Sequence, residues 1–430
     1  MDIINWQDLS LPERSQCLER PAQESASSVH DIVVDIIANV KKRGDEALIE
    51  YAHKLDKCPD DKLKLSEQEI AQACERIDPQ LKAAIDQAYI NISLFHKAQE
   101  PCHVKVQTVA GIECQTATHP IEKVGLYVPG GSAPLVSTAL MLGVPAQIAK
   151  CEQVVLTSPY PLSDGIIYAA SKCGIKEIFK LGGAHAIAAL AYGTATVPKV
   201  NKIFGPGNQF VTMAKRLVSD DPNGAAIDMP AGPSEVLVIA DETADETFVA
   251  ADLLSQAEHG PDSQVILVSP STSLLERTQQ ALAEQLELLP RKEIALKALS
   301  KSRLIKTNDL QEAIEISNTY APEHLIVQIA DPHAIVAQLR NAGSIFLGAY
   351  TCESMGDYAS GTNHTLPTYG YAKTASALGT DDFRRRYTIS CASAQGLRNI
   401  GHTVEVLASA EGLDAHRNAV TLRLNKIGRN

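Results

Sequence analysis

The feature that most constrains the fold of this chain is a regular alternation of two hydrophobic patterns, which begins near residue 124. Short apolar runs, typical of buried strands, are followed by longer segments with apolar residues at helical spacing. This first set comprises strands at 124–128, 153–157, 177–181 and 200–204, and helices at 138–150, 166–173, 184–192 and 210–218. Strands that alternate with helices predict βαβ units with right-handed crossovers, and therefore a parallel sheet.

The same alternation starts again at Glu235, which indicates a second sheet. Strands are predicted here at 236–240, 264–268, 304–306, 325–329 and 344–347, and helices at 246–258, 274–289, 309–317 and 332–341. Aromatic residues make up only 5% of the chain, which suits helices packed on buried strands better than an aromatic-rich sandwich. We therefore expect an α/β protein with two Rossmann-like parallel-sheet domains in tandem, joined by a hinge near residues 230–233.

The two ends of the chain depart from this alternation. Residues 31–55 and 65–97 carry apolar side chains at helical spacing, so the N-terminal region is predicted to be helical. The segment from Tyr350 to Thr380 is rich in Gly, Thr and Ser. A strand and a helix at 404–420 are predicted for the polar segment that closes the chain.

Charge and cysteine usage exclude several classes of protein. The formal net charge is −12, without a Lys/Arg cluster that could displace counterions from a nucleic acid. The first residues lack the basic segment and apolar core of a signal peptide, and no apolar stretch approaches the ~20 residues that span a bilayer. The nine cysteines are scattered and never form C-x-x-C, as in reduced cytosolic proteins. We therefore expect a cytoplasmic enzyme without nucleic-acid or membrane partners.

Two glycine-rich turns are candidate phosphate-binding sites. The segment GPGNQF (205–210) follows a predicted strand and opens a helix, as a dinucleotide fingerprint does, but Phe210 replaces the third glycine. A second turn, PGGS (129–132), follows the first strand of the same sheet. Ligands of open α/β sheets bind at the carboxyl edge of the strands, where both turns are expected. The alternative is that each is simply a strand-to-helix turn.

Oxygen and imidazole side chains form a pool of possible metal ligands. They contain no thiolate, which suits zinc or manganese, although sequence spacing cannot select four of them. Ser234 and Glu235 follow a rigid, Pro-flanked turn, which is either an interdomain connection or a polar loop at a ligand cleft. The pool consists of Gln256, His259, Glu323, His324, Asp357, His364, Glu411 and His416. Glu411 and His416 would lie ~140° apart on one ideal helix, so spacing alone does not place both in one site.

Seven motifs, in this order along almost the whole chain, resemble the histidinol dehydrogenase family. They are GLYVPGG (125–131), FGPGN (204–208), IDMPAGPSE (227–235), SQAEHGP (255–261), YAPEH (320–324), GDYASGTNH (356–364) and EGLDAH (411–416). The resemblance implies oxidation of L-histidinol to L-histidine through L-histidinaldehyde, with reduction of two NAD⁺ and one zinc ion per subunit. It also implies a homodimer whose active site is shared between subunits.

The resemblance assigns roles to individual residues. The implied zinc ligands are Gln256, His259, Asp357 and His416, the last from the partner subunit. These four also surround the substrate, together with Ser234, His324, His364 and Glu411. Within the implied catalytic pair, His324 is the base that removes the hydroxyl proton, and Glu323 activates the water that adds to the aldehyde.

The implied NAD contacts are Tyr127, His185 and Asn208. Here the sequence departs from the family, which usually carries Gln at the position of His185. An imidazole can still donate or accept one hydrogen bond, but without the reach of an amide.

The resemblance also implies a division of the chain into four parts. These are an N-terminal arm (1–22), a discontinuous first α/β domain with the metal and catalytic residues (23–123 plus 235–377), an NAD-binding second α/β domain (124–234) and a C-terminal dimerisation segment (378–430). Two alternative functions stay open. One is a dehydrogenase of the same family for another small polar alcohol, and the other is a metal-dependent hydrolase that uses the same ligands without NAD.

Overall fold

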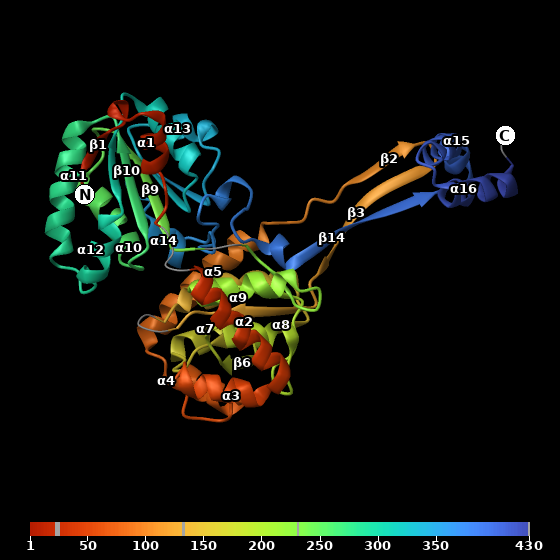
Figure 1. The fold of residues 1–430 in the computed structure, drawn as a ribbon, viewed down its shortest axis with the longest axis horizontal. Coiled ribbons are helices and arrows are strands. Elements are labelled where there is room, and N and C mark those ends of the chain that lie inside the picture. The colour runs from red at the N-terminus through yellow and green to blue at the C-terminus, as the bar shows by residue number, and fades with distance from the viewer. Residues whose placement is uncertain (22–25, 131–133, 230–231, 429–430) are drawn as a thin grey trace.

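The computed structural model describes residues 1–21, 26–130, 134–229 and 232–428 of the chain. It contains two α/β domains that lie side by side and a long, thin arm that projects away from both (Figure 1). Parts of the predicted turn at 129–132 and of the predicted hinge at 230–233 lie outside the described residues. The two tandem parallel sheets that the hydrophobic alternation predicts are confirmed.

The first domain is built on a six-stranded, fully parallel sheet in the order β1-β11-β10-β9-β12-β13. Its central strands are buried on both faces, which explains their continuous apolar sequences. The strands are β1 (Ile3–Asn5), β9 (Glu235–Ala240), β10 (Gln264–Ser269), β11 (Arg303–Lys306), β12 (His324–Gln328) and β13 (Ser344–Leu347). The edge strand β1 was not predicted, since only three residues form it.

Alternate side chains of each strand pack against different helical layers. In β9, Val236 and Val238 belong to the apolar core beneath three helices, whereas Leu237 and Ile239 belong to the core on the opposite face. The first layer contains α10 (Glu246–Ala257), α11 (Thr272–Leu286) and α12 (Lys292–Ser300). The second contains α1 (Leu11–Cys17) and α13 (Leu310–Tyr320).

The second domain has a parallel five-stranded sheet in the order β6-β5-β4-β7-β8. Its strands are β4 (Lys123–Tyr127), β5 (Gln153–Ser158), β6 (Glu177–Lys180), β7 (Lys202–Phe204) and β8 (Ala226–Ile227). The helices between or after them are α6 (Val136–Ala149), α7 (Asp164–Lys172), α8 (Gly183–Tyr192) and α9 (Gln209–Asp220). Apart from β8, which was not predicted, these bounds agree closely with the predicted ones.

The N-terminal helices pack on the second domain, which corrects the predicted division of the chain. Residues 23–123 were expected to belong to the first domain together with 235–377. Instead, apolar residues of these helices share two cores with the helices and strands of the five-stranded sheet. The helices are α2 (Ala26–Arg43), α3 (Asp45–Lys54), α4 (Glu67–Arg76) and α5 (Pro79–Lys97). Gly44, at a φ of 58°, ends the first of them, so the single helix predicted at 31–55 is two.

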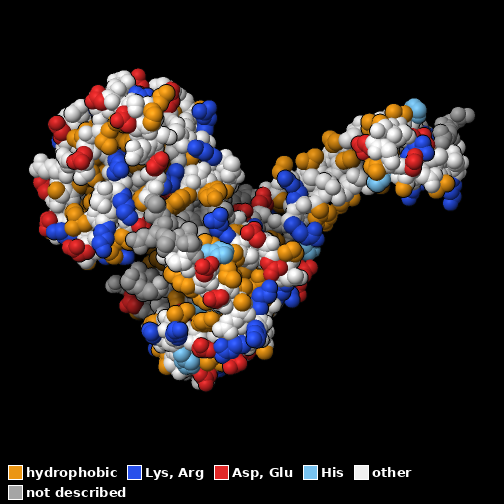
Figure 2. Space-filling view, in the orientation of Figure 1, with side chains coloured by type: hydrophobic (Ala, Val, Ile, Leu, Met, Phe, Trp, Pro, Cys, Tyr) orange, Lys and Arg blue, Asp and Glu red, His pale blue; other side chains and the backbone are white. Residues whose placement is uncertain are grey.

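The arm consists of three antiparallel strands that end in a helical hairpin (Figure 1). The strands are β2 (Lys105–Val109), β3 (Ile112–Pro120) and β14 (Arg384–Ala392), and the hairpin is α15 (Ala394–Ala410) and α16 (Asp414–Ile427). Gly412, at a φ of 71°, separates the two helices, so the single helix predicted at 404–420 is wrong. Hydrophobic side chains are visible along the surface of the arm (Figure 2).

Two smaller elements complete the fold. Residues 332–341, predicted as an α-helix, form a 3₁₀ helix, η2 (Pro332–Gln338). The glycine-rich segment after β13 contains a short helix, α14 (Glu353–Tyr358). Among the helices of the described ranges, none combines the length and the apolar character that crossing a bilayer requires.

Candidate functional site

His324 is the centre of a buried polar cluster at the amino end of two neighbouring strands. It is the first residue of β12 and pairs in register with Val236 of β9, the residue after Glu235. His324 Nδ1 lies 3.2 Å from the backbone oxygen of Glu235, and His324 Nε2 lies 3.4 Å from Asp357 Oδ1. With a proton on Nδ1 the ring can donate to the Glu235 carbonyl, and when Nε2 is also protonated it faces the Asp357 carboxylate as a donor.

Several carboxylates surround this imidazole. Burial alone would lower the pKa of His324, but the carboxylates of Glu353 and Glu323, followed by that of Asp357, raise this pKa well above its usual value. Glu353 Oε2 lies 4.0 Å and Glu323 Oε2 lies 3.7 Å from His324 Nδ1. The cluster therefore favours a histidine that can accept and hold a proton.

Glu323 stands immediately before β12, outside the strand alternation. Its Oε2 accepts a hydrogen bond of 2.9 Å from the backbone N–H of Glu235 and one of 3.4 Å from Gln256 Nε2. Burial raises the pKa of the Glu323 carboxyl to about 8. Adjacent side chains within a regular strand point to opposite faces of the sheet. Because β12 begins at His324, Glu323 lies outside the strand, and both side chains can reach the same cluster.

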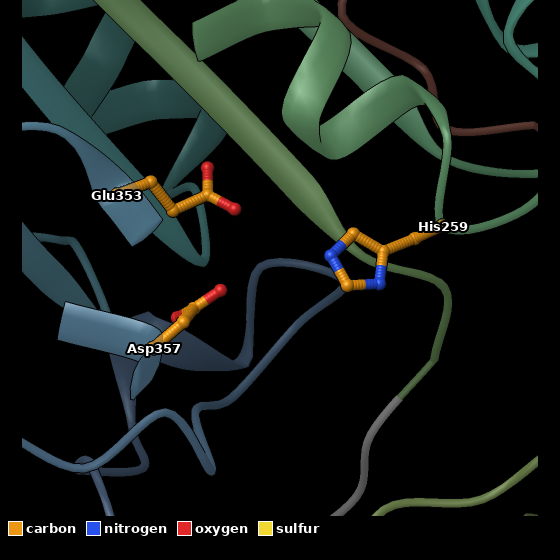
Figure 3. A group of neighbouring side chains, drawn as sticks. All are labelled: His259, Glu353 and Asp357. Atoms are coloured by element: carbon orange, nitrogen blue, oxygen red, sulfur yellow. The ribbon is translucent and has the colours of Figure 1, made fainter. Parts of the chain in front are cut away.

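A second group of side chains forms a candidate metal site next to His324. Ligand atoms of His259, Glu353 and Asp357 all lie within 4.8 Å of one another (Figure 3). His259 follows the end of α10, and the two acids lie on α14. Gln256 is in the last turn of α10, and its Nε2 is 3.2 Å from His324 Nδ1. Two motifs far apart in the sequence thus converge.

The free atoms of this cluster suit a divalent cation. Within the described parts of the chain, Gln256 Oε1, Glu353 Oε2 and Asp357 Oδ1 are buried without a hydrogen-bond partner. Buried oxygen atoms rarely lack a partner, so three in one cluster are suited to binding a cation. Oxygen and imidazole donors without thiolates match zinc or manganese, and the residues present therefore fit the predicted metal.

A cavity of about 800 Å³ lies at the carboxyl edge of the second sheet. Tyr127, at the end of β4, His185, in the first turn of α8, and Asn208, the N-cap of α9, line this cavity together. Tyr127 Oη accepts a hydrogen bond of 3.2 Å from the backbone N–H of Gly183, and burial raises the pKa of this phenol to about 12. Asn208 caps α9 by accepting from the N–H of Phe210 and Val211. The volume is sufficient for a cofactor-sized ligand.

A buried ion pair holds the glycine turn that leads to Asn208. Lys215 Nζ donates to the Gly205 carbonyl at 2.7 Å, and Asp228 Oδ2 accepts from the Gly205 N–H at 2.8 Å. Lys215 and Asp228 also contact each other at 2.5 Å. Gly205 has a φ of 119°, and a Cβ there would lie 2.0 Å from the Tyr127 carbonyl oxygen, so only glycine fits.

Comparison with known proteins shows which family this chain resembles. A family model described as histidinol dehydrogenase matches residues 18–424. Histidinol dehydrogenase of Photobacterium profundum is 56% identical over 427 residues, which cover 99% of this chain and 96% of that protein. Histidinol dehydrogenase of Vibrio parahaemolyticus is 55% identical over 430 residues, which cover 100% of this chain and 100% of that protein. The crystal structure of histidinol dehydrogenase from Elizabethkingia anophelis matches with a TM-score of 0.95 at 45% identity, and covers 99% of this chain and 98% of that one.

The chain belongs to the histidinol dehydrogenase family. The family that the seven motifs indicate is thereby confirmed, and the protein is an oxidoreductase of that name in histidine biosynthesis. Its match to a solved histidinol dehydrogenase covers almost the full length of both chains, so the arm belongs to the shared fold.

Some of the residues that the motifs predict for the histidinol dehydrogenase site are brought together within one chain. Gln256, His259 and Asp357 lie with the catalytic candidates Glu323 and His324. His364 lies near the same cluster, since the charges of Asp357, His324 and His259 all affect its pKa. Burial is the main influence and lowers the pKa of His364 to about 4. Ser234 directly precedes Glu235, whose backbone contacts both catalytic candidates.

Glu411 and His416 lie elsewhere. Both are exposed at the far end of the arm, where Glu411 caps α15 and His416 lies on α16 (Figure 1). A single chain does not bring either residue to the metal cluster. In the histidinol dehydrogenase resemblance, His416 comes from a partner subunit, and the exposed position of the arm is compatible with this arrangement.

His185, which stands where the family resemblance implies a glutamine, has its own buried partner. His185 Nε2 lies 2.9 Å from Asp56 Oδ2, and the same oxygen accepts from the N–H of Gly182 at 2.9 Å. His185 Nδ1 is buried and makes no hydrogen bond with the described residues. Because its distal nitrogen is already engaged, this imidazole cannot extend into the cavity as a glutamine amide would.

Two residues of these sites were missed from the sequence. Glu353 carries a recognisable signal, since it precedes Asp357 by four residues and the two therefore share one face of α14. Asp56 carries none, because it lies between α3 and α4, far in sequence from every motif of the cofactor cavity. Only packing of the N-terminal helices on the second sheet places its carboxylate beside His185.

Proposed function

We propose that the protein oxidises L-histidinol to L-histidine through L-histidinaldehyde, in two NAD-linked steps at a zinc-containing site shared by two subunits. The observation that carries this proposal is the buried contact of Glu323 and His324 with the metal cluster of Gln256, His259 and Asp357. A base and a second proton-carrying group beside a cation site are what successive oxidation of an alcohol and an aldehyde requires.

In the proposal, Gln256, His259 and Asp357 hold zinc together with His416 of the partner subunit. Gln256 Oε1 and Asp357 Oδ1, which are buried without a hydrogen-bond partner among the described residues, support this assignment. When bound, zinc would orient the imidazole and amine of the substrate and polarise nearby oxygen atoms. Glu353 is close enough to add a carboxylate to the same cluster.

His324 acts as the base in both oxidations. Its Nδ1–H is held by the Glu235 carbonyl, so Nε2 can take the proton of the substrate hydroxyl as the carbinol carbon loses a hydride. When bound at the cavity lined by Tyr127, His185 and Asn208, NAD⁺ would supply the hydride acceptor for each step. The surrounding carboxylates stabilise the imidazolium that forms.

Glu323 serves the second step. The aldehyde must add water to give a gem-diol before a second hydride can leave, and a carboxylate can take the proton of that water as its oxygen attacks. Burial brings the pKa of Glu323 to about 8, within range for proton transfer near neutral pH. Retention of the aldehyde in the buried site would protect a reactive intermediate from solution.

The proposed homodimer rests on the arm. It extends away from its own two domains and carries Glu411 and His416 exposed at its tip (Figure 1). Apolar side chains are exposed along its strands and helices, among them Val106, Ile389 and Leu422. Such a surface is typical of an interface between subunits. A cytoplasmic location stays a prediction from the sequence.

The decisive experiment measures NADH production from L-histidinol by the purified protein. Two NADH per histidinol are expected, with loss of activity after chelation and recovery when Zn²⁺ is added back. Comparable rates on alcohols without an imidazole would favour another alcohol substrate. Conversion that proceeds without NAD⁺ would favour a metal-dependent hydrolase and contradict the proposal.

A further inference from the structure

The N-terminal segment that follows α1 reaches the catalytic cluster through one arginine. Arg20 Nε lies 2.5 Å from Glu235 Oε1, and Arg20 Nη2 lies 2.9 Å from Glu235 Oε2, which makes a bidentate ion pair. The exposed fraction of the side chain is 15% for Arg20 and 2% for Glu235. A pair with this geometry and burial is among the stronger ion pairs of proteins.

Two further contacts fix the guanidinium in place. Arg20 Nη2 donates to the carbonyl oxygen of Tyr320 at 2.9 Å, and the guanidinium carbon lies 4.1 Å from the centre of the Tyr320 ring. Tyr320 ends α13, the helix that leads directly to Glu323 and His324. Arg20 therefore contacts the chain at two points next to the catalytic pair: at Glu235, the first residue of β9, and at Tyr320, just before Glu323.

Glu235 in turn holds both catalytic candidates with its backbone. Its N–H donates to Glu323 Oε2 at 2.9 Å, and its carbonyl oxygen lies 3.2 Å from His324 Nδ1. Its carboxylate also accepts from the N–H of Tyr369 at 2.9 Å. Arg20 thus holds the side chain of Glu235, while the backbone of Glu235 orients Glu323 and His324.

Loss of the guanidinium would leave the Glu235 carboxylate buried without its cationic partner. A buried unpaired carboxylate either moves towards water or takes up a proton. Movement of the first residue of β9 would displace the two backbone groups that bind Glu323 and His324. Displacements of about 1 Å in such groups can lower catalytic rates by roughly 100-fold.

We propose that Arg20 is a positioning residue, which acts through Glu235 to hold Glu323 and His324 in their catalytic orientation. The proposal rests on the catalytic roles proposed above for these two residues. The N-terminal segment would then take part in the reaction indirectly. Its sequence contains none of the seven motifs, so the sequence alone does not indicate this role.

The test compares three variants of the full-length, zinc-loaded enzyme: Arg20→Met, Arg20→Lys and Arg14→Met. Arg14 is the matched control, because it lies in the same segment but contacts Trp6, with its Nε 3.2 Å from the Trp6 carbonyl oxygen. Arg20→Met is expected to lower kcat for both half-reactions about 10- to 100-fold, with little change in the KM for NAD⁺. Arg20→Lys should recover part of kcat, and Arg14→Met should leave kcat within about twofold of wild type.

The outcomes separate positioning from a merely structural role. Thermal melting and zinc content are measured for every variant, and a fall in kcat without loss of either supports the proposal. Wild-type kcat in Arg20→Met would overturn it, as would a fall in kcat that only follows loss of folded protein. If Arg20→Met does not fold, a wild-type kcat in folded Arg20→Lys, whose amine cannot form the bidentate contact, overturns it. An inactive wild-type enzyme would instead contradict the proposed function itself.

Discussion

His324 and Asp357 lie on separate elements, yet His324 Nε2 is 3.4 Å from Asp357 Oδ1. His324 begins β12, an inner strand of the six-stranded sheet, and Asp357 lies on the short helix α14, which follows β13. Asp357 thus joins the proposed base to the proposed metal site. A change at this carboxylate should affect both.

Asp357→Asn should therefore reduce bound zinc and lower activity together. The substitution keeps the size of the side chain but removes a negative charge from the cation site, and the loss of one ligand weakens metal binding about 10- to 100-fold or more. Zinc per chain is measured by atomic emission after dialysis. Asp262→Asn is the control, because Asp262 pairs with Lys301 outside the cluster. Full zinc occupancy in Asp357→Asn would remove Asp357 from the ligand set.

Glu323→Gln should impair the aldehyde-to-acid step more than the alcohol step. The amide keeps the shape of the side chain and can still accept from the Glu235 N–H, but it cannot take a proton from water. We expect a loss of roughly 100-fold or more in the second oxidation and a much smaller loss in the first. Single-turnover NADH formation from histidinol and from histidinaldehyde separates the two steps. Equal losses would contradict the division of labour.

Subunit mixing tests the shared site directly. His259→Asn and His416→Asn should each abolish activity as homodimers. In a random mixture, about half of the dimers combine both variants, and each of these contains one site with both native histidines. The mixture should then recover about a quarter of wild-type activity. The two proteins are refolded or co-expressed with different tags and assayed together. No recovery, with mixed dimers present, would argue that both histidines belong to one chain's site.

Asp56→Asn should weaken NAD⁺ binding. Its carboxylate makes charge-assisted contacts with His185 and the N–H of Gly182 at the wall of the cofactor cavity. Loss of such contacts should raise the KM for NAD⁺ about tenfold with little change in kcat. Asp35→Asn serves as the control, because Asp35 lines the same cavity but is exposed. Equal effects of the two substitutions would show that only the charge of the cavity matters.

Asp252→Asn should raise stability at neutral and alkaline pH. Asp252 is buried on α10, and burial raises its pKa from 3.8 to about 7, although a hydrogen bond from Gln328 opposes the shift. The folded state therefore binds the proton more tightly than the unfolded chain, and stability falls as pH rises from about 4 to about 7. Without the titrating group, this decline should shrink by an amount on the order of 2 kcal/mol.

Melting temperatures of the wild type and Asp252→Asn across this pH range check the prediction. Asp245→Asn provides a contrast on the same helix, since Asp245 is the exposed N-cap of α10 and should show no comparable gain at high pH. A parallel decline in the wild type and Asp252→Asn would show that Asp252 does not cause it.

The strands and helices of the two sheets could be predicted from sequence because their cause is local. Residues 236–240 of β9 and 265–268 of β10 are all apolar and buried by the parallel sheet, and a short run of this kind can be recognised without knowing its neighbours. The arm could not be predicted in this way. Eight of the nine residues of β14 are exposed, so no hydrophobic alternation marks it as a strand. Likewise, nothing in helical periodicity tells which sheet α2 to α5 cover.

The sequence by itself determined the order of the motifs, the family, the βαβ rhythm and the pool of oxygen and imidazole ligands. Only the tertiary structure decided which of these side chains meet. It shows that Glu353 and Asp56 belong to the two sites, that Arg20 pairs with Glu235, and that His416 lies at the end of the arm. The physical reason is that propensity and periodicity act over a few residues. The position of a ligand, in contrast, depends on how entire helices and strands bury their apolar faces against one another.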